Sequence, residues 1–350
     1  MAQATIAEGS TSATPVPPSG AGRGSGSLLL RTLVQRREAT VFIVTIAVII
    51  YFCVRNANFY SQTNIITMLQ YIAPIAVLGS GQVLLLVLAE IDLSAGQVFL
   101  TAPWVTYWMH TDGLSIGLSI AVALVVSVAI GAFNGIFTTV FGVPSLVVTL
   151  GTNYALEGIV LIQSGAIQVD MFGGSNSSGG TTGFGQIFGI ASYSEVVWAL
   201  AFCVVVWVLL KKSRFGTHVT ATGGNLLGAA ESGIPVRRVK ILCFMIIAFG
   251  AGLIGIIDSI RIGSLDPASP GLDIVLSGIV AAVIGGTALT GGRGTILGTL
   301  VGAVFLGVLE DGFNLIGVSA NWFLFAEGVV ILAAMALNVQ LGSLAKRTER

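Results

Sequence analysis

Stretches of about 20 apolar residues follow one another along most of this 350-residue chain. A helix that crosses the hydrocarbon core of a bilayer needs roughly 20 such residues. Only 9% of all residues are charged, too few to cover the surface of a water-soluble chain of this length. The pattern predicts an all-α, polytopic membrane protein with about ten transmembrane helices. The predicted spans are 39–55, 65–89, 94–110, 114–141, 145–163, 194–210, 240–262, 274–290, 295–316 and 321–339.

The two ends of the chain lack such stretches. Residues 1–27 are rich in Ala, Ser, Thr, Pro and Gly, and Arg31, Arg36 and Arg37 follow, which predicts a disordered, basic cytoplasmic tail at 1–38. Residues 39–340 are predicted to form the membrane domain, and 341–350 a short basic C-terminal tail. The first apolar stretch begins too late for a cleaved signal peptide, so we expect it to be retained as a span.

Basic residues predict the orientation of the chain in the membrane. Thirteen of the 16 Lys and Arg residues fall in four clusters, at 23–37, 211–214, 237–240 and 346–350. Basic loops stay on the cytoplasmic side of a membrane. Ten spans place all four clusters on one side, so we expect both termini to be cytoplasmic. Segment 164–193 has no Lys or Arg and is expected on the opposite side.

Several classes of protein lack their characteristic residues in this sequence. The net charge is zero, so nothing indicates a nucleic-acid partner. Cys53, Cys203 and Cys243 lie singly in apolar stretches, and His110 and His218 have no metal-ligand spacing, so no metal site is predicted. No GxxxxGK[ST], HExxH or GxSxG motif is present, so we predict no catalytic residues and no cofactor. A process driven by ATP would need another chain to bind the ATP.

Two short patterns recur and indicate a possible internal duplication. Leu93-Ser94-Ala95-Gly96 is similar to Leu289-Thr290-Gly291-Gly292, and Phe133-Asn134 is similar to Phe313-Asn314. The spacing differs between the two copies, so inverted and parallel repeats both stay open.

Glycines also recur at intervals of four residues, which removes side chains from one helix face and lets another backbone approach. We expect these glycines to pack spans within the chain, with a contact between subunits as the alternative. The sets are Gly294, Gly298 and Gly302, then Gly113 and Gly117, then Gly131 and Gly135.

Polar residues inside or beside the apolar stretches are candidates for a translocation path, because a charge at the bilayer centre costs at least about 2.5 kcal/mol. The candidates, with Phe133 from the recurring pair, are Glu90, Asp92, Phe133, Asn134, Asn153, Glu157 and Asn314. Purely structural roles compete with this one. Asp92 has the position of a residue that caps the next helix, and buried Asn side chains commonly join helices. Further acids near the spans are Asp258, Glu310, Asp311 and Glu327.

The only substantial loop on the predicted cytoplasmic side is 211–240. Asn225 is a suitable N-cap and Gly233 a suitable stop, which predicts a short helix of about two turns between them. A short helix at a basic membrane edge can lie on the lipid surface or dock into a groove of a soluble partner. The residues of the loop leave both possibilities open.

Three blocks of the sequence are similar to motifs of a known family. Residues 89–96, AEIDLSAG, resemble the motif GGIDLSVG, and residues 223–240 resemble GGNxxAAxxSGIxVxxxK. Residues 285–303 resemble GGTxLxGGxGxxxGTxxGA. On these blocks the chain resembles the permease subunits of bacterial ABC importers for monosaccharides, of the ribose, xylose and arabinose type. Ala89 and Glu90 stand where the first motif has glycines, so Glu90 adds a carboxylate beside Asp92.

The resemblance implies a function and a set of partners. Members of the family carry a monosaccharide or related polyol into the cell through two permease chains in the bacterial cytoplasmic (inner) membrane. Separate ATP-binding ABC subunits hydrolyse ATP, so the permease is not itself an enzyme, and an extracytoplasmic sugar-binding protein delivers the solute. The short helix at 225–232 would then dock on the ATP-binding subunit. The expected coupling residues are Gly224, Asn225, Ala229, Ala230, Glu231, Ser232, Gly233 and Arg237.

Three alternatives stay open. A permease of the same superfamily for a branched-chain amino acid or a nucleoside has the same motifs. An ion-coupled secondary transporter would use Glu90, Asp92 and Glu157 as proton or sodium sites. A regulatory membrane scaffold would transport nothing.

Overall fold

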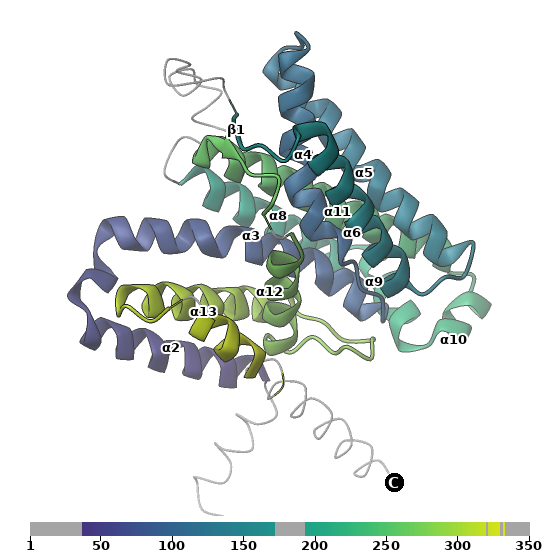
Figure 1. The fold of residues 1–350 in the computed structure, drawn as a ribbon. Helices are drawn as coiled ribbons and strands as arrows, with labels where there is room; N and C mark the ends of the chain where they lie inside the picture. The colour runs from purple at the N-terminus through teal and green to yellow at the C-terminus, as the bar shows by residue number, and fades with distance from the viewer. Residues whose placement is uncertain (1–36, 172–192, 270, 320, 330–331, 333–350) are drawn as a thin grey trace, which may run out of the picture. The chain divides into compact units, whose positions relative to one another are not determined.

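The computed structural model describes residues 37–171, 193–269, 271–319, 321–329 and 332, and these are almost entirely helical (Figure 1). The first part of the chain forms α2 (Arg37–Arg55), the 3₁₀ helix η1 (Ala57–Tyr60), α3 (Gln62–Val87), α4 (Ser94–Thr111), α5 (Ile116–Thr139) and α6 (Ser145–Ser164). The second part forms α8 (Ser194–Lys212), α9 (Arg214–Gly224), α10 (Leu226–Glu231), α11 (Val236–Ile262), α12 (Gly271–Ile284) and α13 (Ile296–Leu315). A last helical segment covers 321–329. Strands β1 (Val169–Asp170) and β2 (Ser264–Leu265) pair antiparallel, with Val169 opposite Leu265.

The predicted helical membrane fold is confirmed. A helix lies at each predicted span, although the last span, 321–339, is described only at 321–329 and 332. Among the described residues, six helices are long and apolar enough to cross a membrane: α3, α5, α6, α8, α11 and α13. The number of crossings and the side of the two termini stay predictions. The proposed tails, at 1–38 and 341–350, lie almost wholly outside the described residues.

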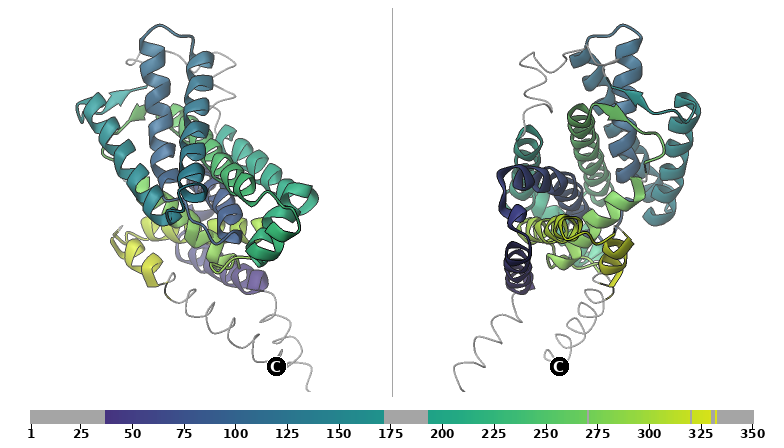
Figure 2. Two further views of the ribbon diagram at one scale, coloured as in Figure 1. Left: turned by 90° about the vertical axis from the view of Figure 1, so that its right-hand side faces the viewer. Right: turned by 60° about the vertical axis from the view of Figure 1, so that its left-hand side comes forward.

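The central helix of the described fold is α3. It runs through Pro74 without a break, as membrane helices do when neighbouring groups satisfy the freed backbone. Its residues from Ile72 to Val87 are all buried, in contact with α8, α11, α12 and α13. Figures 1 and 2 show α13 between α3 and α2, in agreement with its contacts to both. Helix α3 ends at Val87.

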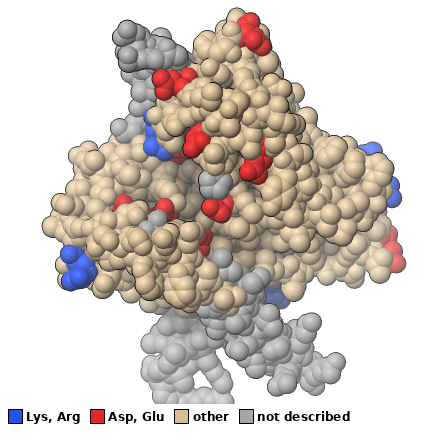
Figure 3. Space-filling view, viewed as in Figure 1, with Lys and Arg blue, Asp and Glu red and all other residues tan. Residues whose placement is uncertain are grey.

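The outer helices expose apolar side chains. Only 28% of the apolar window of α5, and 28% of that of α6, is buried within the chain, against 89% for α3. Val125 on α5 and Ile162 on α6 are among the large exposed apolar residues. Figure 3 shows that most of one face is uncharged, with acidic side chains gathered near its middle. Such a surface suits lipid tails or another apolar protein surface rather than water.

Small residues bring α12 and α13 into contact. A Cβ on Gly298 would overlap the carbonyl of Gly285, and one on Gly302 would overlap the carbonyl of Ala281. This pair therefore packs spans within the chain, as the sequence predicts.

The other two glycine sets differ. Gly131 and Gly135 lie against the backbone of α11, so here too the prediction of packing within the chain is confirmed. Gly113 and Gly117 have no atom within 4 Å of the position of an added Cβ. Within the part of the chain that the structure describes, the packing prediction is wrong for this pair. Gly113, at φ +100°, belongs instead to the turn between α4 and α5.

Candidate functional site

Three segments that are distant in sequence meet at the C-terminal end of α3. The carbonyl oxygen of Val87 accepts a hydrogen bond from the backbone N–H of Gly292 at 2.8 Å. Gly223, near the end of α9, lies so close to the same carbonyl that an added Cβ would overlap it. The three motif blocks of the sequence therefore converge on this end of α3.

A non-helical break at 88–93 separates α3 from α4. Every backbone N–H from Leu88 to Ser94 donates a hydrogen bond. The acceptors are the carbonyls of Leu85 and Leu86, then the side chains of Ser145, Gln82, Thr149 and Asp92. Interrupted helices are tolerated within a membrane protein where the freed polar groups find such partners. Groups on α3 and α6 thus define the conformation of the break.

Ala89 occupies a backbone conformation that favours glycine. Its φ is +58°, in the left-handed region, where a side chain costs roughly 1–2 kcal/mol. The motif that this block resembles has glycine at this position. The departure from the motif therefore adds backbone strain in the break.

Asp92 is fully buried at the start of α4. Its Oδ1 atom accepts hydrogen bonds from the N–H of Ser94 at 2.9 Å and from the Ser94 hydroxyl at 2.6 Å. Its backbone carbonyl accepts a further bond from the side-chain amide of Gln82. Asp92 therefore caps α4 by accepting a hydrogen bond from its first backbone N–H. Capping is the structural role that competes, on the sequence alone, with a place on the translocation path. Oδ2 has no hydrogen-bond partner among the described residues.

Asn134 joins three helices. Its Nδ2 atom donates to the hydroxyl of Ser94 on α4 at 2.8 Å, and its Oδ1 atom accepts from the hydroxyl of Thr152 on α6 at 2.7 Å. Asn134 itself belongs to α5 and is fully buried. The amide thus has the interhelical role that is common for buried Asn in membranes. Together Asp92, Ser94, Asn134 and Thr152 form one connected chain of polar side chains.

The other path candidates lie apart from this chain of bonds or at its margin. Asn153, on α6 beside Thr152, is buried, and its Oδ1 atom has no partner in the described part of the chain. Glu157, one turn further along α6, is half-buried. Phe133 is 48% exposed and contacts Phe137, with ring centroids 4.3 Å apart and the rings tilted by 36°. Asn314 is exposed at the end of α13.

Glu90 and Asp92 have different partners. The Glu90 carboxylate lies 2.5 Å from the ammonium nitrogen of Lys240, near the start of α11. The two side chains are only 13% and 16% exposed. The extra carboxylate beside Asp92 is therefore neutralised by a lysine of a different motif block.

The short helix α10 has the ends that the sequence predicts. The Asn225 side chain accepts from the N–H of Gly228 at 3.0 Å, and Gly233 has a φ of +81°. Ala229 is buried, whereas Leu226 and Leu227 are 48% and 75% exposed. The helix thus presents two leucines away from the rest of the described chain.

Helix α9, which precedes α10, is missing from the sequence prediction. It begins after Ser213, whose hydroxyl accepts from the N–H of Gly216 at 3.2 Å, and it contacts α3 and α8. Ser213 was the signal for a helix start, although the glycines and threonines that follow favour a loop.

Comparison with known proteins identifies the family. Residues 64–335 match the family described as the permease component of branched-chain amino acid transport systems. This chain belongs to that permease family. It is a multi-pass protein of the cytoplasmic membrane.

Several named permeases are similar to this chain over most of their length. The xylose/arabinose import permease protein XylH of Sulfolobus acidocaldarius is 35% identical over 87% of this chain and 86% of its own. The ribose import permease protein RbsC of Bacillus subtilis is 34% identical over 85% of this chain and 91% of its own. The D-allose transport system permease protein AlsC of Escherichia coli is 30% identical over 86% and 91% respectively. No solved structure matches the chain significantly.

The permease also contains a charged cluster that was not predicted from the sequence. Arg261, in the last turn of α11, donates to Glu195 at 2.7 Å and lies 2.5 Å from Asp258. Glu195 is only 1% exposed. The carboxylates of Glu195 and Asp258 come from helices far apart in sequence, so the signals were the separate positions of Asp258 and Arg261 inside one span and not their contact with Glu195. Asp258 also lines a cavity of about 250 Å³ with Trp104 and Asp266.

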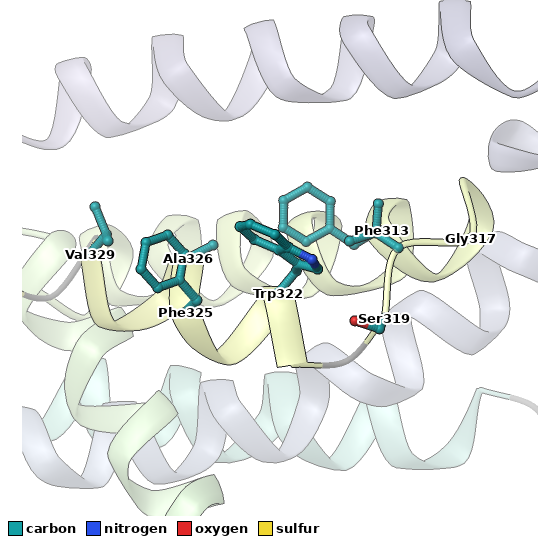
Figure 4. Close-up of a pocket in the computed structure, with 8 residues that line it drawn as sticks. Phe313, Gly317, Ser319, Trp322, Phe325, Ala326 and Val329 are labelled. Carbon is teal, nitrogen blue, oxygen red and sulfur yellow. The ribbon is translucent and has the colours of Figure 1, made fainter.

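A larger apolar groove of about 820 Å³ lies at the end of α13. Figure 4 shows Trp322, Phe325 and Val329 along the segment 321–329, with Phe313 of α13 facing the same groove. Its lining includes no candidate from the sequence analysis and offers mainly apolar surface, which suits a lipid chain or an apolar side chain better than a sugar.

Proposed function

We propose that this permease is the membrane subunit of an ATP-driven importer that carries a monosaccharide or related polyol into the cell. The observation that carries the proposal is the similarity, over most of the chain, to permeases named for xylose/arabinose, ribose and D-allose. The three motif blocks support it further, because they converge on one end of α3 rather than lying scattered over the fold.

The partners proposed are an ATP-binding ABC subunit, an extracytoplasmic sugar-binding protein and a second permease chain in the bilayer. The absence of a GxxxxGK[ST] motif supports ATP binding by a separate subunit. The exposed Leu226 and Leu227 of α10 support the docking of this helix into an apolar groove of that subunit. The coupling loop is 211–240, within a membrane domain of 39–340.

We propose that part of the translocation path is lined by the hydrogen-bonded side chains of Asp92, Ser94, Asn134 and Thr152, with Asn153 beside them. Carboxylate and amide oxygens accept hydrogen bonds from the hydroxyl groups of a sugar. The unpartnered Oδ2 of Asp92 and Oδ1 of Asn153 support this role, because a buried polar atom without a partner is costly. Glu157, Phe133 and Asn314 are proposed as outer parts of the same path.

The test is uptake into proteoliposomes that contain the permease with its ATP-binding subunit and binding protein. Radiolabelled ribose, xylose, arabinose and D-allose are supplied outside, with and without ATP inside. We expect uptake of at least one sugar that stops when ATP hydrolysis is blocked. Uptake of leucine instead of sugars would indicate an amino-acid permease. Uptake by the permease alone under a proton or sodium gradient would indicate a secondary transporter.

A further inference from the structure

The Glu90–Lys240 ion pair connects two parts of the permease that have different proposed roles. Glu90 lies in the break between α3 and α4, two residues before Asp92. Lys240 lies in α11, directly after the segment that contains α10. The ion pair therefore joins the coupling segment to the residues that begin α4.

The pair is well shielded from water. The separation of 2.5 Å and side-chain exposures of 13% and 16% describe a close, largely desolvated contact rather than a solvated surface pair. In such a place each charge depends on the other, because a single remaining charge would be left without compensation. As long as both side chains stay shielded from water, electrostatic attraction holds Lys240 to Glu90.

Backbone hydrogen bonds link the pair to its surroundings on both sides. On the α10 side, the N–H of Ile234 donates to the carbonyl of Ala229 at 3.0 Å, which closes the turn between α10 and α11. On the other side, the N–H of Glu90 donates to Leu85 at 2.9 Å, and Asp92 holds the first amide of α4. A displacement of α10 that moves the start of α11 therefore reaches the start of α4 through Lys240 and Glu90.

A second contact between the same parts has a different character. Gly223 packs against the carbonyl of Val87 through shape alone, with no charge involved. That contact limits how closely α9 approaches α3, whereas the ion pair also resists separation. With both contacts present, the coupling segment and the end of α3 would resist both closer approach and separation.

We propose that Glu90 and Lys240 are a positioning pair that transmits the movement of the α10 segment to the start of α4 and so keeps ATP hydrolysis coupled to solute passage. This inference rests on the proposed function. It assigns no contact with the solute to either residue. It gives a role to Glu90, one of the residues by which the first motif block departs from its pattern.

The test compares Glu90→Gln, Lys240→Gln and the exchanged pair Glu90→Lys with Lys240→Glu in the reconstituted complex. Solute uptake and ATP hydrolysis are measured together. We expect each single variant to lower the number of solute molecules imported per ATP by about fivefold or more, because the connection is lost. The exchanged pair should restore the ratio to within about twofold of the wild type. Arg55→Gln, which removes an exposed charge outside the pair, is the matched control and should leave the ratio unchanged.

Single variants with the ratio of the wild type, or an exchanged pair as impaired as the single variants, would overturn the proposal. The melting temperatures of the wild type, Glu90→Gln, Lys240→Gln and the double variant Glu90→Gln with Lys240→Gln, purified without partners, provide a readout that needs no transport. A double-mutant cycle without interaction between positions 90 and 240 would show that the pair does not form. Absence of ATP-dependent uptake by the wild-type complex would count against the proposed function instead, while the melting cycle would still decide whether the pair exists.

Discussion

The backbone N–H of Gly292 donates a hydrogen bond to the carbonyl oxygen of Val87, the last residue of α3. The same carbonyl is the surface against which Gly223 packs. One oxygen atom therefore joins the end of α3, the end of α9 and the turn before α13. A change in any of the three segments must be accommodated by the other two, which explains why side chains are absent at the contact.

Replacement of Gly223 by Ala is expected to destabilise the permease. The added Cβ would overlap the Val87 carbonyl, and overpacking of this kind costs about 1–3 kcal/mol. The neighbouring Gly224 has no atom within 4 Å of an added Cβ, so Gly224→Ala is the matched control. The measurement is the melting temperature in detergent. Equal melting temperatures for the two variants would contradict the close contact.

Replacement of Ala89 by Gly is expected to stabilise the permease. Glycine adopts the φ of +58° without the penalty of a side chain, and this gain exceeds the extra backbone entropy by roughly 0.5–1 kcal/mol. Ala95→Gly is the matched comparison and is expected to destabilise the permease. Ala95 is buried in the first turn of α4, where glycine costs about 1 kcal/mol in helix propensity. Thermal unfolding of the two variants should therefore shift in opposite directions. A lower melting temperature for Ala89→Gly would show that the alanine is not strained.

Local features of the fold were predictable from the sequence, because their causes lie within a few residues. The ends of α10 follow from the side chain of Asn225 and the positive φ of Gly233. Helix α9 was not predictable in the same way. Its glycines and threonines disfavour a helix, and contacts with α3 and α8 override that preference.

Replacement of Asn134 by Ala is expected to loosen the contacts among α4, α5 and α6. The change leaves the hydroxyl groups of Ser94 and Thr152 without their amide partner, at a cost of about 1–3 kcal/mol. Asn314→Ala is the control, because an exposed side chain contributes within about 0.5 kcal/mol. Chemical or thermal unfolding of both variants gives the comparison. An Asn134 variant as stable as the control would remove the interhelical role.

Replacement of Asn225 by Ala is expected to weaken the proposed association with an ATP-binding subunit. Loss of the N-cap destabilises α10 by about 1 kcal/mol, and a frayed helix presents its leucines less well. Asn225→Ser keeps a side-chain oxygen that can cap the helix, so it should bind like the wild type. Co-purification with the ATP-binding subunit measures the difference. If the Ala and Ser variants co-purify equally well, the cap has no part in docking.

The candidate site was predictable only in its residue types. Asp92 and Asn134 stand out in the sequence as polar residues among apolar ones, but their connection through the Ser94 hydroxyl depends on how α4 and α5 pack. The partner of Glu90 was equally hidden, because Lys240 lies 150 residues further along the chain. Contacts of this kind arise from tertiary packing, for which a single sequence contains no local signal.

The complete set of hydrogen bonds in the break at 88–93 has a consequence for how this region moves. Amide protons exchange with deuterium from solvent when their bonds open, so the break should be protected to a similar degree as the helices beside it. A loop that worked as a soft hinge would exchange quickly. Any shift of the start of α4 must therefore take Gln82, Ser145 and Thr149 with it as a rigid body, or proceed in a single step in which several amides change acceptor at once.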